Sequence, residues 1–528
     1  VRQRWEAAIR QIIDRQARPV LEGAKQRLIV RHQQAMRNPL ERARLYAFYA
    51  TLGLPNLPDE YVSRLQSLSI EQIEQAAQAI FEGNQKEKTV PPVNTGNLQE
   101  EVRTYSPPPK QESLQGASSI FRQTLATGVR VIALRQPGAK QVVLQMLIAT
   151  GPDAERDFPP GASELTARML FTITRNETEA SLAYRIARSG GSLQLDWEPI
   201  GVRIIAIAEP ATIENVLSLL KEGLTRAVFT PDALKQALQA ALAERRRMDG
   251  VHELPLYDAL LRQLDHASLY ASAEQLQRVR LEDIKAFYRR HYRRDRFVMV
   301  IAGDLPVERL TELMQRYFGS ADEPERFSAR QEPRPPNSAW QEPRPPVDFT
   351  VKALSHPLNA PTLYIGFGLR MPVRSPEEYA ALLVVQALLC EGKGSALFRQ
   401  FREAHGIGYA FGGSAIVWDG EGVLLGFLQL GASRASKREE LLNRLQSMLR
   451  QQPLAPDALS RARALVEGRW RRDQLDIFER TRRLAIVEAS GVGYLAEEHL
   501  PELLKKVGVE LIQKLHRGIV QAQPHAPE

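Results

Sequence analysis

Two stretches near opposite ends of this 528-residue chain match each other without a gap. The first runs from Arg44 to Ile80 and the second from Arg483 to Ile519, a separation of 439 residues. The matched positions are mostly apolar and recur at helical spacing. Such self-similarity marks a repeated folding unit, so we expect the chain to open with the tail of one unit and to close with the tail of another. The alternative is chance similarity between two amphipathic helices.

A second pair of matching segments lies between these ends. Thr230-Pro-Asp-Ala-Leu234 and Ala455-Pro-Asp-Ala-Leu459 each place a proline near the first turn of a predicted helix, with an aspartate beside it. Within the first copy, Val142–Ala149 reads as a strand, and Ser192–Ile207 alternates apolar and polar residues. We therefore expect an α+β fold built from two diverged copies of one domain.

Composition divides the chain into folded segments and linkers. We expect the following division: 1–85, a helical C-terminal portion of a preceding domain; 86–118, a linker; 119–320, a first complete domain; 321–348, a Pro-rich linker; and 349–528, a second domain. The second linker carries Gln-Glu-Pro-Arg-Pro-Pro twice. We interpret it as a stiff spacer, and a polyproline docking ligand is the alternative.

Charge and composition exclude several classes of protein. The net charge of +8 comes from 70 Lys+Arg scattered among 62 Asp+Glu, which disfavours nucleic-acid binding. The apolar runs are too short to span a membrane. The lone Cys390 sits in an apolar helical run and is interpreted as a core residue. The compartment stays open: bacterial cytoplasm, periplasm or an organelle.

The segment Gly161–Phe171 is a predicted helix with an unusual polar face. Glu164, Ala167 and Arg168 share that face, because positions i, i+3 and i+4 are neighbours on a helix. Glu164 and Arg168 have the spacing of a helix ion pair. Arg168 cannot ligate a cation, and Ala167 offers no base that could activate water.

This segment resembles the zinc helix of the pitrilysin and insulysin proteases (inverzincins), which carry H-x-x-E-H and run on into Met-Leu-Phe. Aligned on Met169-Leu-Phe171, the first His falls on Glu164, the catalytic Glu on Ala167 and the second His on Arg168. The resemblance implies two homologous inverzincin (insulinase-like metallohydrolase) domains, each an antiparallel-rich sheet covered by helices. It also implies the non-zinc-binding half or subunit, similar to processing-peptidase-like bacterial proteins. A scaffold helix is expected here, with a surviving metal site as the alternative.

The third zinc ligand of that family is a Glu on a later helix, and Glu244 is its counterpart by resemblance. A supporting acid seven residues earlier is replaced by Ala237. We expect Glu164, Arg168 and Glu244 to form a carboxylate–guanidinium cluster rather than a zinc site. No metal or other cofactor is therefore expected in this chain.

A second element of the family is better preserved. Ser395–Tyr409 resembles a segment whose Arg and Tyr, seven residues apart, belong to the half without zinc. The resemblance implies that Arg402 and Tyr409 reach the partner's zinc site, position the substrate carbonyl and stabilise the oxyanion. The alternative is a salt-bridged Arg beside a packed Tyr with an exposed hydroxyl.

The histidines do not form a metal-binding pattern. His252, His266, His291 and His405 are isolated from one another in the sequence and are interpreted as surface or packing residues. An active peptidase with an unrecognised metal site is the least favoured possibility, since the sequence has no H-x-x-x-H or H-x-x-E-H pair.

These observations favour the zinc-free half or subunit of a two-part peptidase, inactive alone. Its expected partner is a zinc-bearing inverzincin half, either a separate subunit or a segment upstream of Val1, and its expected substrate is an unfolded peptide. The alternative is a catalytically inactive family member that serves as an assembly scaffold or a peptide-binding module.

Overall fold

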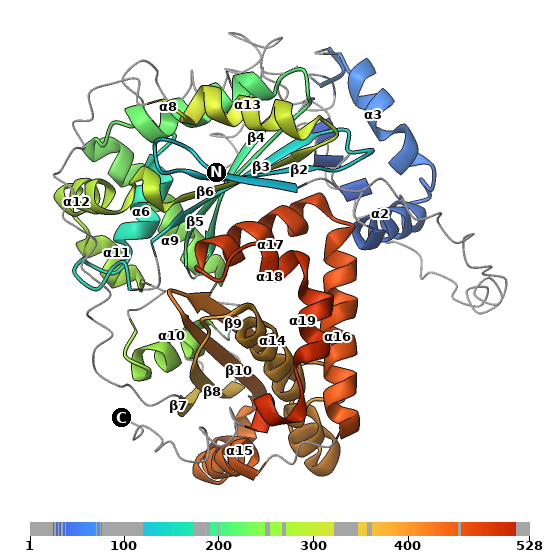
Figure 1. Ribbon diagram of the computed structural model, residues 1–528, viewed down its shortest axis with the longest axis vertical. Coiled ribbons are helices and arrows are strands. Elements are labelled where there is room, and N and C mark those ends of the chain that lie inside the picture. The colour runs from blue at the N-terminus through green and yellow to red at the C-terminus, as the bar shows by residue number, and fades with distance from the viewer. Residues whose placement is uncertain are drawn as a thin grey trace.

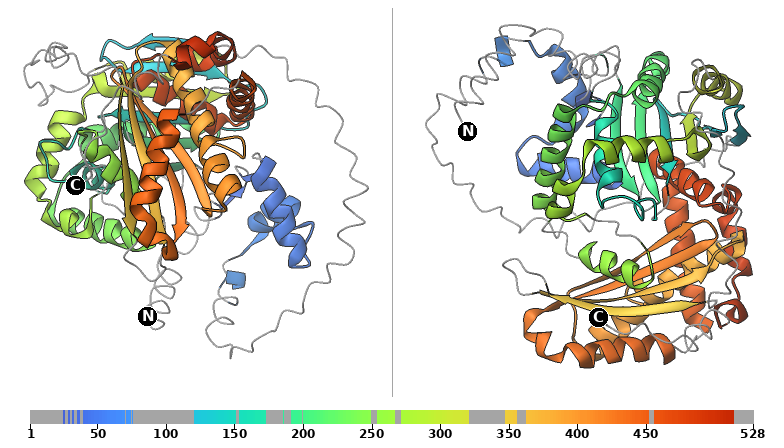
Figure 2. Two further views of the ribbon diagram at one scale, coloured as in Figure 1. Left: turned by 90° about the horizontal axis from the view of Figure 1, so that it is seen from below. Right: turned by 90° about the vertical axis from the view of Figure 1, so that its left-hand side faces the viewer.

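The fold is of the α+β class, as predicted, with two sheets stacked along the long axis of the molecule and helices around both (Figures 1 and 2). The computed structural model describes residues 25, 28–29, 31–32, 35–36, 39–69, 71–73, 75, 120–150, 153–172, 185, 191–198, 200–248, 254–266, 271–320, 347–355, 362–451 and 456–513. Within these ranges, every helix is too short or too polar to cross a lipid bilayer.

The first sheet has six strands in the order β1-β2-β6-β3-β5-β4. They are β1 (Ile120–Thr124), β2 (Arg130–Arg135), β3 (Val142–Ala149), β4 (Ser192–Glu198), β5 (Gly201–Ala208) and β6 (Phe297–Gly303). Strands β2 and β6 are parallel, and the other neighbours pair antiparallel. The predicted strand Val142–Ala149 is β3, and the alternating run from Ser192 forms a hairpin of two strands, β4 and β5.

The second sheet has four antiparallel strands in the order β7-β8-β10-β9. They are β7 (Asp348–Ser355), β8 (Thr362–Pro372), β9 (Ala410–Trp418) and β10 (Glu421–Gly431). In both sheets a long strand pairs with the second strand of a later hairpin, as β3-β5-β4 and as β8-β10-β9. The shared strand order supports two copies of one design.

The helices follow the same order in the two copies. Those before the second sheet are α2 (Pro39–Thr51), α3 (Leu57–Ser67), α6 (Ala162–Met169), α8 (Ile213–Arg226), α9 (Pro231–Met248), α10 (Leu254–Gln263), α11 (Ala273–Arg278), α12 (Leu281–His291) and α13 (Val307–Phe318). Those after its first strands are α14 (Pro376–Cys390), α15 (Arg438–Gln451), α16 (Pro456–Gln474), α17 (Ile477–Ala489), α18 (Leu495–Glu498) and α19 (Leu500–Lys506), together with a π-helix, η5 (Phe398–Glu403). Short 3-10 turns lie at η3 (Arg294–Arg296) and η6 (Ala432–Lys437). Helices α9 and α16 both begin at the predicted prolines.

Each half of the chain lends one helix to the sheet of the other half. Helix α10 packs on β7, β8 and β10, whereas α17 packs on β3 and β6 (Figure 1). Leu256 and Leu260 of α10 and Leu484 of α17 are fully buried in one core with residues of both sheets. Gly366 on β8 permits the close approach of α10, since a Cβ there would lie 2.7 Å from a methyl group of Leu256.

Alternation along the first sheet creates two apolar faces. In β2, Val131 and Ala133 join the core beneath α8 and α13, whereas Ile132 and Leu134 join the core shared with the second sheet. Period-two alternation places successive side chains on opposite faces, so a strand that is apolar throughout is covered on both sides. The first sheet is therefore enclosed by helices of both halves.

Polar contacts fix the position of α17 on the first sheet. Gln145 is a polar residue on the apolar face of β3, and its amide donates to the Phe478 carbonyl at 2.7 Å and to the Thr481 hydroxyl at 3.0 Å. At the other end of the helix, Arg122 forms an ion pair of 2.9 Å with Glu488, whose side chain is 5% exposed. Because these contacts are directional, they fix the position of α17 along the sheet, which the apolar contacts alone would not do.

The predicted segment boundaries stay predictions, because the linkers fall largely outside the described residues. This applies to 86–118, to all but the last two residues of 321–348, and to both copies of the Gln-Glu-Pro-Arg-Pro-Pro repeat. At the predicted end of the second linker, Asp348 begins β7. Cys390 is buried at the end of α14, in agreement with its interpretation as a core residue, and burial raises the pKa of its thiol.

We predict that Leu484→Ala lowers the free energy of unfolding by about 2–5 kcal/mol, because it removes a fully buried side chain from the core between the sheets. Urea denaturation of the purified chain measures this loss. Leu475→Ala is the matched control, since Leu475 lies just before α17 and is 77% exposed. Equal effects of the two substitutions would contradict the assigned position of α17.

Candidate functional site

Four charged side chains meet where α6 crosses α9. The Arg168 guanidinium donates to Glu164 Oε1 from Nε at 3.0 Å and from Nη2 at 2.9 Å, and it also bonds Glu244. On the other side, Arg245 Nη2 lies 2.5 Å from Glu164 Oε2 and its Nε donates to the Ala271 carbonyl at 2.8 Å. The ion pair predicted between Glu164 and Arg168 is present, and Arg245 is a member that the sequence interpretation missed.

The cluster is mostly shielded from solvent. The side chains of Glu164, Arg168 and Arg245 are 11%, 18% and 13% exposed, whereas Glu244 is 40% exposed. Two carboxylates face two guanidinium groups, so the formal charges balance. Partial burial removes water that would otherwise solvate and screen the charges. Each charged group is therefore stabilised mainly by its ion-pair partners.

This donor set does not suit zinc. Protein zinc sites combine three or four His, Cys, Asp or Glu ligands, and Glu164 and Glu244 already accept hydrogen bonds from arginines. Ala167, at the position aligned with the catalytic glutamate, is fully buried and has no proton acceptor. Within the ranges that the structure describes, no group of three or more potential metal ligands gathers anywhere.

Glu155 positions the start of α6. Its carboxylate accepts the backbone N–H of Gly161 at 2.8 Å and that of Ser163 at 2.5 Å. Gly161, the N-cap, has a φ of +98° and no side chain to cap the helix, so Glu155 supplies the cap from outside. Burial raises the pKa of Glu155 to about 7, although the two backbone donors oppose that shift.

His266 connects the two halves of the molecule. Its Nδ1 lies 3.4 Å from Asp153, in the segment between β3 and α6, and its Nε2 lies 3.0 Å from Glu421 at the start of β10. The ring meets Trp418 edge to face at a centroid distance of 5.0 Å. Burial lowers the pKa of His266, but the two carboxylates outweigh it and the net shift is upward. His266 is thus a packing residue, as interpreted, and it also contacts two carboxylates that the sequence interpretation did not foresee.

The other predicted histidines behave differently. His291 is a packing residue, stacked on Phe287 at a centroid distance of 4.4 Å, and its burial lowers its pKa to about 3. His405 is exposed. His252 lies outside the described residues.

Arg402 lies in the last turn of η5, and Tyr409 lies at the end of the loop that joins η5 to β9. Arg402 is exposed and donates from Nη1 to the Gly408 carbonyl, directly before Tyr409, whose side chain is 77% exposed. Buried Phe401 anchors the loop, because its carbonyl accepts the N–H of Ile407 at 2.8 Å. The exposure of the Tyr409 ring disagrees with the alternative of a packed tyrosine.

Glycines allow this loop to fold. Gly406 and Gly408 have φ values of +60° and +102°, in the left-handed region that glycine adopts without strain. At Gly408 a Cβ would lie 2.6 Å from a methyl carbon of Leu428. A larger residue at Gly408 would displace both the carbonyl that holds Arg402 and the residue that follows it.

The comparison with protein families agrees with this geometry. Residues 130–272 match the model for insulinase (peptidase family M16), and residues 278–466 match the model for the peptidase M16 inactive domain. The two matches together span more than half of the chain. The chain belongs to the M16 peptidase family. The predicted family is thereby confirmed, and Glu164, Ala167, Arg168 and Glu244 all fall within the insulinase match.

Several relatives with curated names share parts of the sequence. An uncharacterized zinc protease of Mycobacterium leprae is 23% identical over 299 residues, which are 56% of this chain and 65% of that protein. A probable mitochondrial-processing peptidase subunit beta of Schizosaccharomyces pombe is 23% identical over 206 residues, 37% of this chain and 44% of that protein. The chain thus spans less than two thirds of the length of these relatives.

Solved structures share the fold. A protease from Helicobacter pylori aligns with a TM-score of 0.62 at 16% identity, covering 76% of this chain and 96% of that one. A peptidase M16 inactive domain from Pseudomonas fluorescens aligns with a TM-score of 0.58 at 15% identity, covering 77% and 95%. The M16 fold of this chain is therefore retained at low sequence identity.

We predict that Arg168→Leu lowers the free energy of unfolding by about 1–3 kcal/mol, because it removes one arginine partner from the shielded Glu164 carboxylate and breaks the contact with the more exposed Glu244. The double variant Glu164→Gln with Arg168→Leu should cost less than the sum of the single substitutions, by about 0.5–3 kcal/mol. Denaturant titration of the four proteins gives this coupling. Additive losses would show that the two side chains contribute independently.

We predict that His266→Gln destabilises the protein mainly at low pH. The folded pKa of His266 is raised above its unfolded value, so its contribution is fully present below about pH 6.5 and is lost as the pH rises through the folded pKa. Unfolding free energies of wild type and variant between pH 5 and pH 8.5 measure the difference. A difference between wild type and His266→Gln that is the same at every pH would contradict the prediction.

Proposed function

We propose that this chain is the zinc-free half of a two-part M16 peptidase. It forms one wall of a peptide-degrading chamber and supplies Arg402 and Tyr409 to the zinc site of its partner half. The observation that carries the proposal is the contrast between two sites. The place where α6 crosses α9, here named the α6–α9 surface, carries the neutral ion-pair cluster of Glu164, Arg168, Glu244 and Arg245. The Arg402–Tyr409 loop instead presents a cation and a phenol to solvent.

The loop suits a role in stabilising a transition state. When water attacks a peptide carbonyl, negative charge develops on the carbonyl oxygen, and donors already held in place stabilise that charge. Arg402 is held by the Gly408 carbonyl, and the backbone N–H of Tyr409 donates to the Gln429 carbonyl at 2.9 Å. The guanidinium and the phenol are thus presented together from a fixed backbone.

The α6–α9 surface supports the second part of the proposal, that the zinc belongs to the partner. A water-activating site here would need at least one further ligand and a base, and Glu164 and Glu244 would first have to lose their arginines. Relatives bearing the names zinc protease and processing peptidase subunit beta make a two-part assembly a reasonable expectation for this chain.

We predict that the chain alone neither binds stoichiometric zinc nor cleaves unfolded peptides. Mixed with a zinc-bearing M16 half, it should support cleavage. In that mixture, Arg402→Ala and Tyr409→Phe should each lower kcat by about 10²–10³, because each removes one donor from the developing oxyanion. Elemental analysis of the chain and steady-state hydrolysis of a fluorogenic peptide give these values.

Arg399→Ala is the matched control, since Arg399 is an exposed arginine on the same π-helix and is expected to leave kcat unchanged. A normal rate with both Arg402→Ala and Tyr409→Phe would favour the scaffold alternative. Stoichiometric zinc in the isolated chain, with activity lost in Glu244→Gln, would overturn the proposal.

A further inference from the structure

The side chain of Tyr409 lies against the end of strand β10. The backbone N–H of Tyr409 donates to the Gln429 carbonyl at 2.9 Å. Two residues further along β10, a Cβ placed on Gly431 would lie 3.6 Å from Cε2 of the Tyr409 ring and 3.8 Å from its hydroxyl oxygen. The backbone of Tyr409 therefore meets β10 at Gln429, and its side chain leans along the strand to Gly431.

The strand pairing leaves room for the ring at this place. The pairing of β10 with β8 continues to Gly431, which lies opposite Thr362, whereas the pairing of β10 with β9 ends where Gln429 lies opposite Ala410. Strand β10 thus runs two residues beyond its last partner on β9, and the Tyr409 side chain lies against this extension. Because β8 holds the backbone of Gly431, the surface beneath the ring is fixed.

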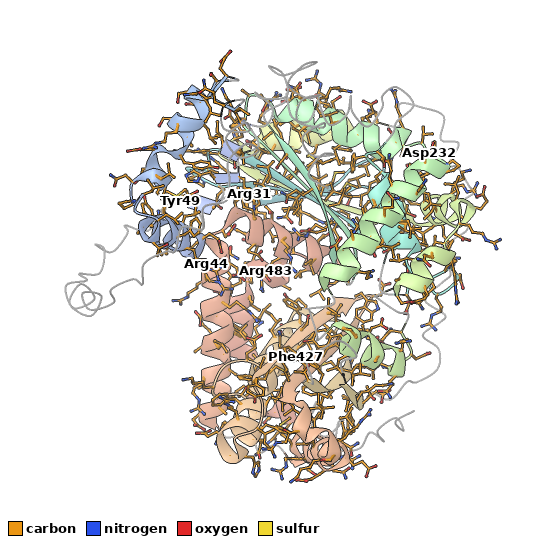
Figure 3. The ribbon with its side chains drawn as sticks, turned by 180° about the vertical axis from the view of Figure 1, so that it is seen from behind. Arg31, Arg44, Tyr49, Asp232, Phe427 and Arg483 are labelled. Atoms are coloured by element: carbon orange, nitrogen blue, oxygen red, sulfur yellow. The ribbon has the colours of Figure 1, made fainter. Side chains whose placement is uncertain are left out.

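The fold itself does not require a glycine at position 431. At Gly412 on β9, by contrast, a Cβ would lie 2.9 Å from the ring of Phe427, the β10 residue labelled in Figure 3. At Gly431 the three nearest atoms belong to Tyr409 and Ser433 and lie at 3.6–3.8 Å, an ordinary van der Waals distance. The φ angle of Gly431 is also outside the left-handed region. A glycine weakens a strand and often marks a close approach by another group, and here that group is the phenol of Tyr409.

A larger side chain at position 431 would compete with the ring for this space. A single methyl group fits, because its neighbours lie at contact distance. A β-branched residue adds two heavy atoms on Cβ in staggered positions, and the space next to this Cβ is already taken by the ring. The Tyr409 side chain is 77% exposed, so it yields by turning toward solvent, whereas the paired strand stays in place.

We propose that Gly431 is a positioning residue for the Tyr409 phenol. The absence of a side chain at position 431 keeps the ring along β10 and thereby fixes the place of its hydroxyl. This inference rests on the proposed function for the reaction in which the phenol takes part. It goes beyond that function by assigning a role to a residue outside the Arg402–Tyr409 loop, which acts on the reaction only through Tyr409.

Crystal structures of the wild type, Gly431→Ala and Gly431→Val test the contact without any partner. We expect the Tyr409 ring to touch residue 431 in the wild type and in the matched control Gly431→Ala, and to turn away from β10 in Gly431→Val. Urea unfolding checks that the three proteins are equally folded. If valine lowers the unfolding midpoint, Gly431→Thr, which is also β-branched, takes its place. A ring that keeps its position in the folded branched variant would overturn the inference.

Kinetics with the zinc-bearing half separate a positioning role from a merely structural one. Gly431→Val should lower kcat by about 10²-fold and leave KM within about twofold, because a donor misplaced by about 1 Å no longer meets the developing oxyanion. Gly431→Ala should keep the wild-type kcat. In the Tyr409→Phe background, Gly431→Val should lower kcat by less than about twofold further, since the hydroxyl that it displaces is already absent.

The same measurements distinguish failure of this inference from failure of the proposed function. A slow Tyr409→Phe together with a normal kcat for folded Gly431→Val would overturn the role of Gly431 alone. Equal losses from Gly431→Val in the wild-type and Tyr409→Phe backgrounds would also overturn it, because the glycine would then act independently of the phenol. A normal kcat for Tyr409→Phe would instead refute the catalytic role proposed for the phenol.

Discussion

The exchange of α10 and α17 between the two halves holds this fold together. Each helix packs on the sheet of the other half, and their buried leucines share one core with both sheets. Burial of each such side chain contributes about 1.5–3 kcal/mol, and several lie in this layer. Without the helix from the other half, the inner apolar face of each sheet would be exposed to solvent. The two domains therefore share one core rather than forming two separate units joined only by a linker.

This exchange also explains where polar groups occur in the interior. Gln145 bonds the backbone and a hydroxyl of α17, and His266 lies within ion-pair distance of Asp153 and Glu421 across the halves. Apolar contacts are non-directional, so they tolerate sliding of a helix on a sheet. Directional bonds between buried groups restrict that sliding, because an unpaired polar atom in the core costs about 1–3 kcal/mol.

Much of the local structure followed from the sequence, whereas the long-range contacts did not. The strand Val142–Ala149, the helix starts at Pro231 and Pro456, and the pairing of Glu164 with Arg168 all depend on short-range periodicity or spacing. Periodicity shows that a helix has an apolar face but not which sheet that face meets, so the exchange was not foreseen. The carboxylate contacts of His266 were missed for a related reason: its two partners lie on distant segments, and nothing near it in the sequence marks them. Arg245 was also missed, because the family pattern specifies the acid at the position of Glu244 and not the residue that follows it.

The same core that joins the halves also fixes the candidate functional loop. Tyr409 immediately precedes β9, and the far end of that strand places Ile416 and Trp418 in the core shared with the first sheet. The loop is therefore attached to a strand whose other end is held by contacts from both halves. A guanidinium and a phenol on such a loop can be exposed while their backbone stays fixed, which is the condition for donors that act without reorganising. The α6–α9 surface meets the opposite condition: its charges neutralise one another, and any new chemistry there would first have to break stabilising contacts. The architecture is thus better suited to a loop that contributes hydrogen-bond donors to a reaction outside the α6–α9 surface than to a reaction at that surface.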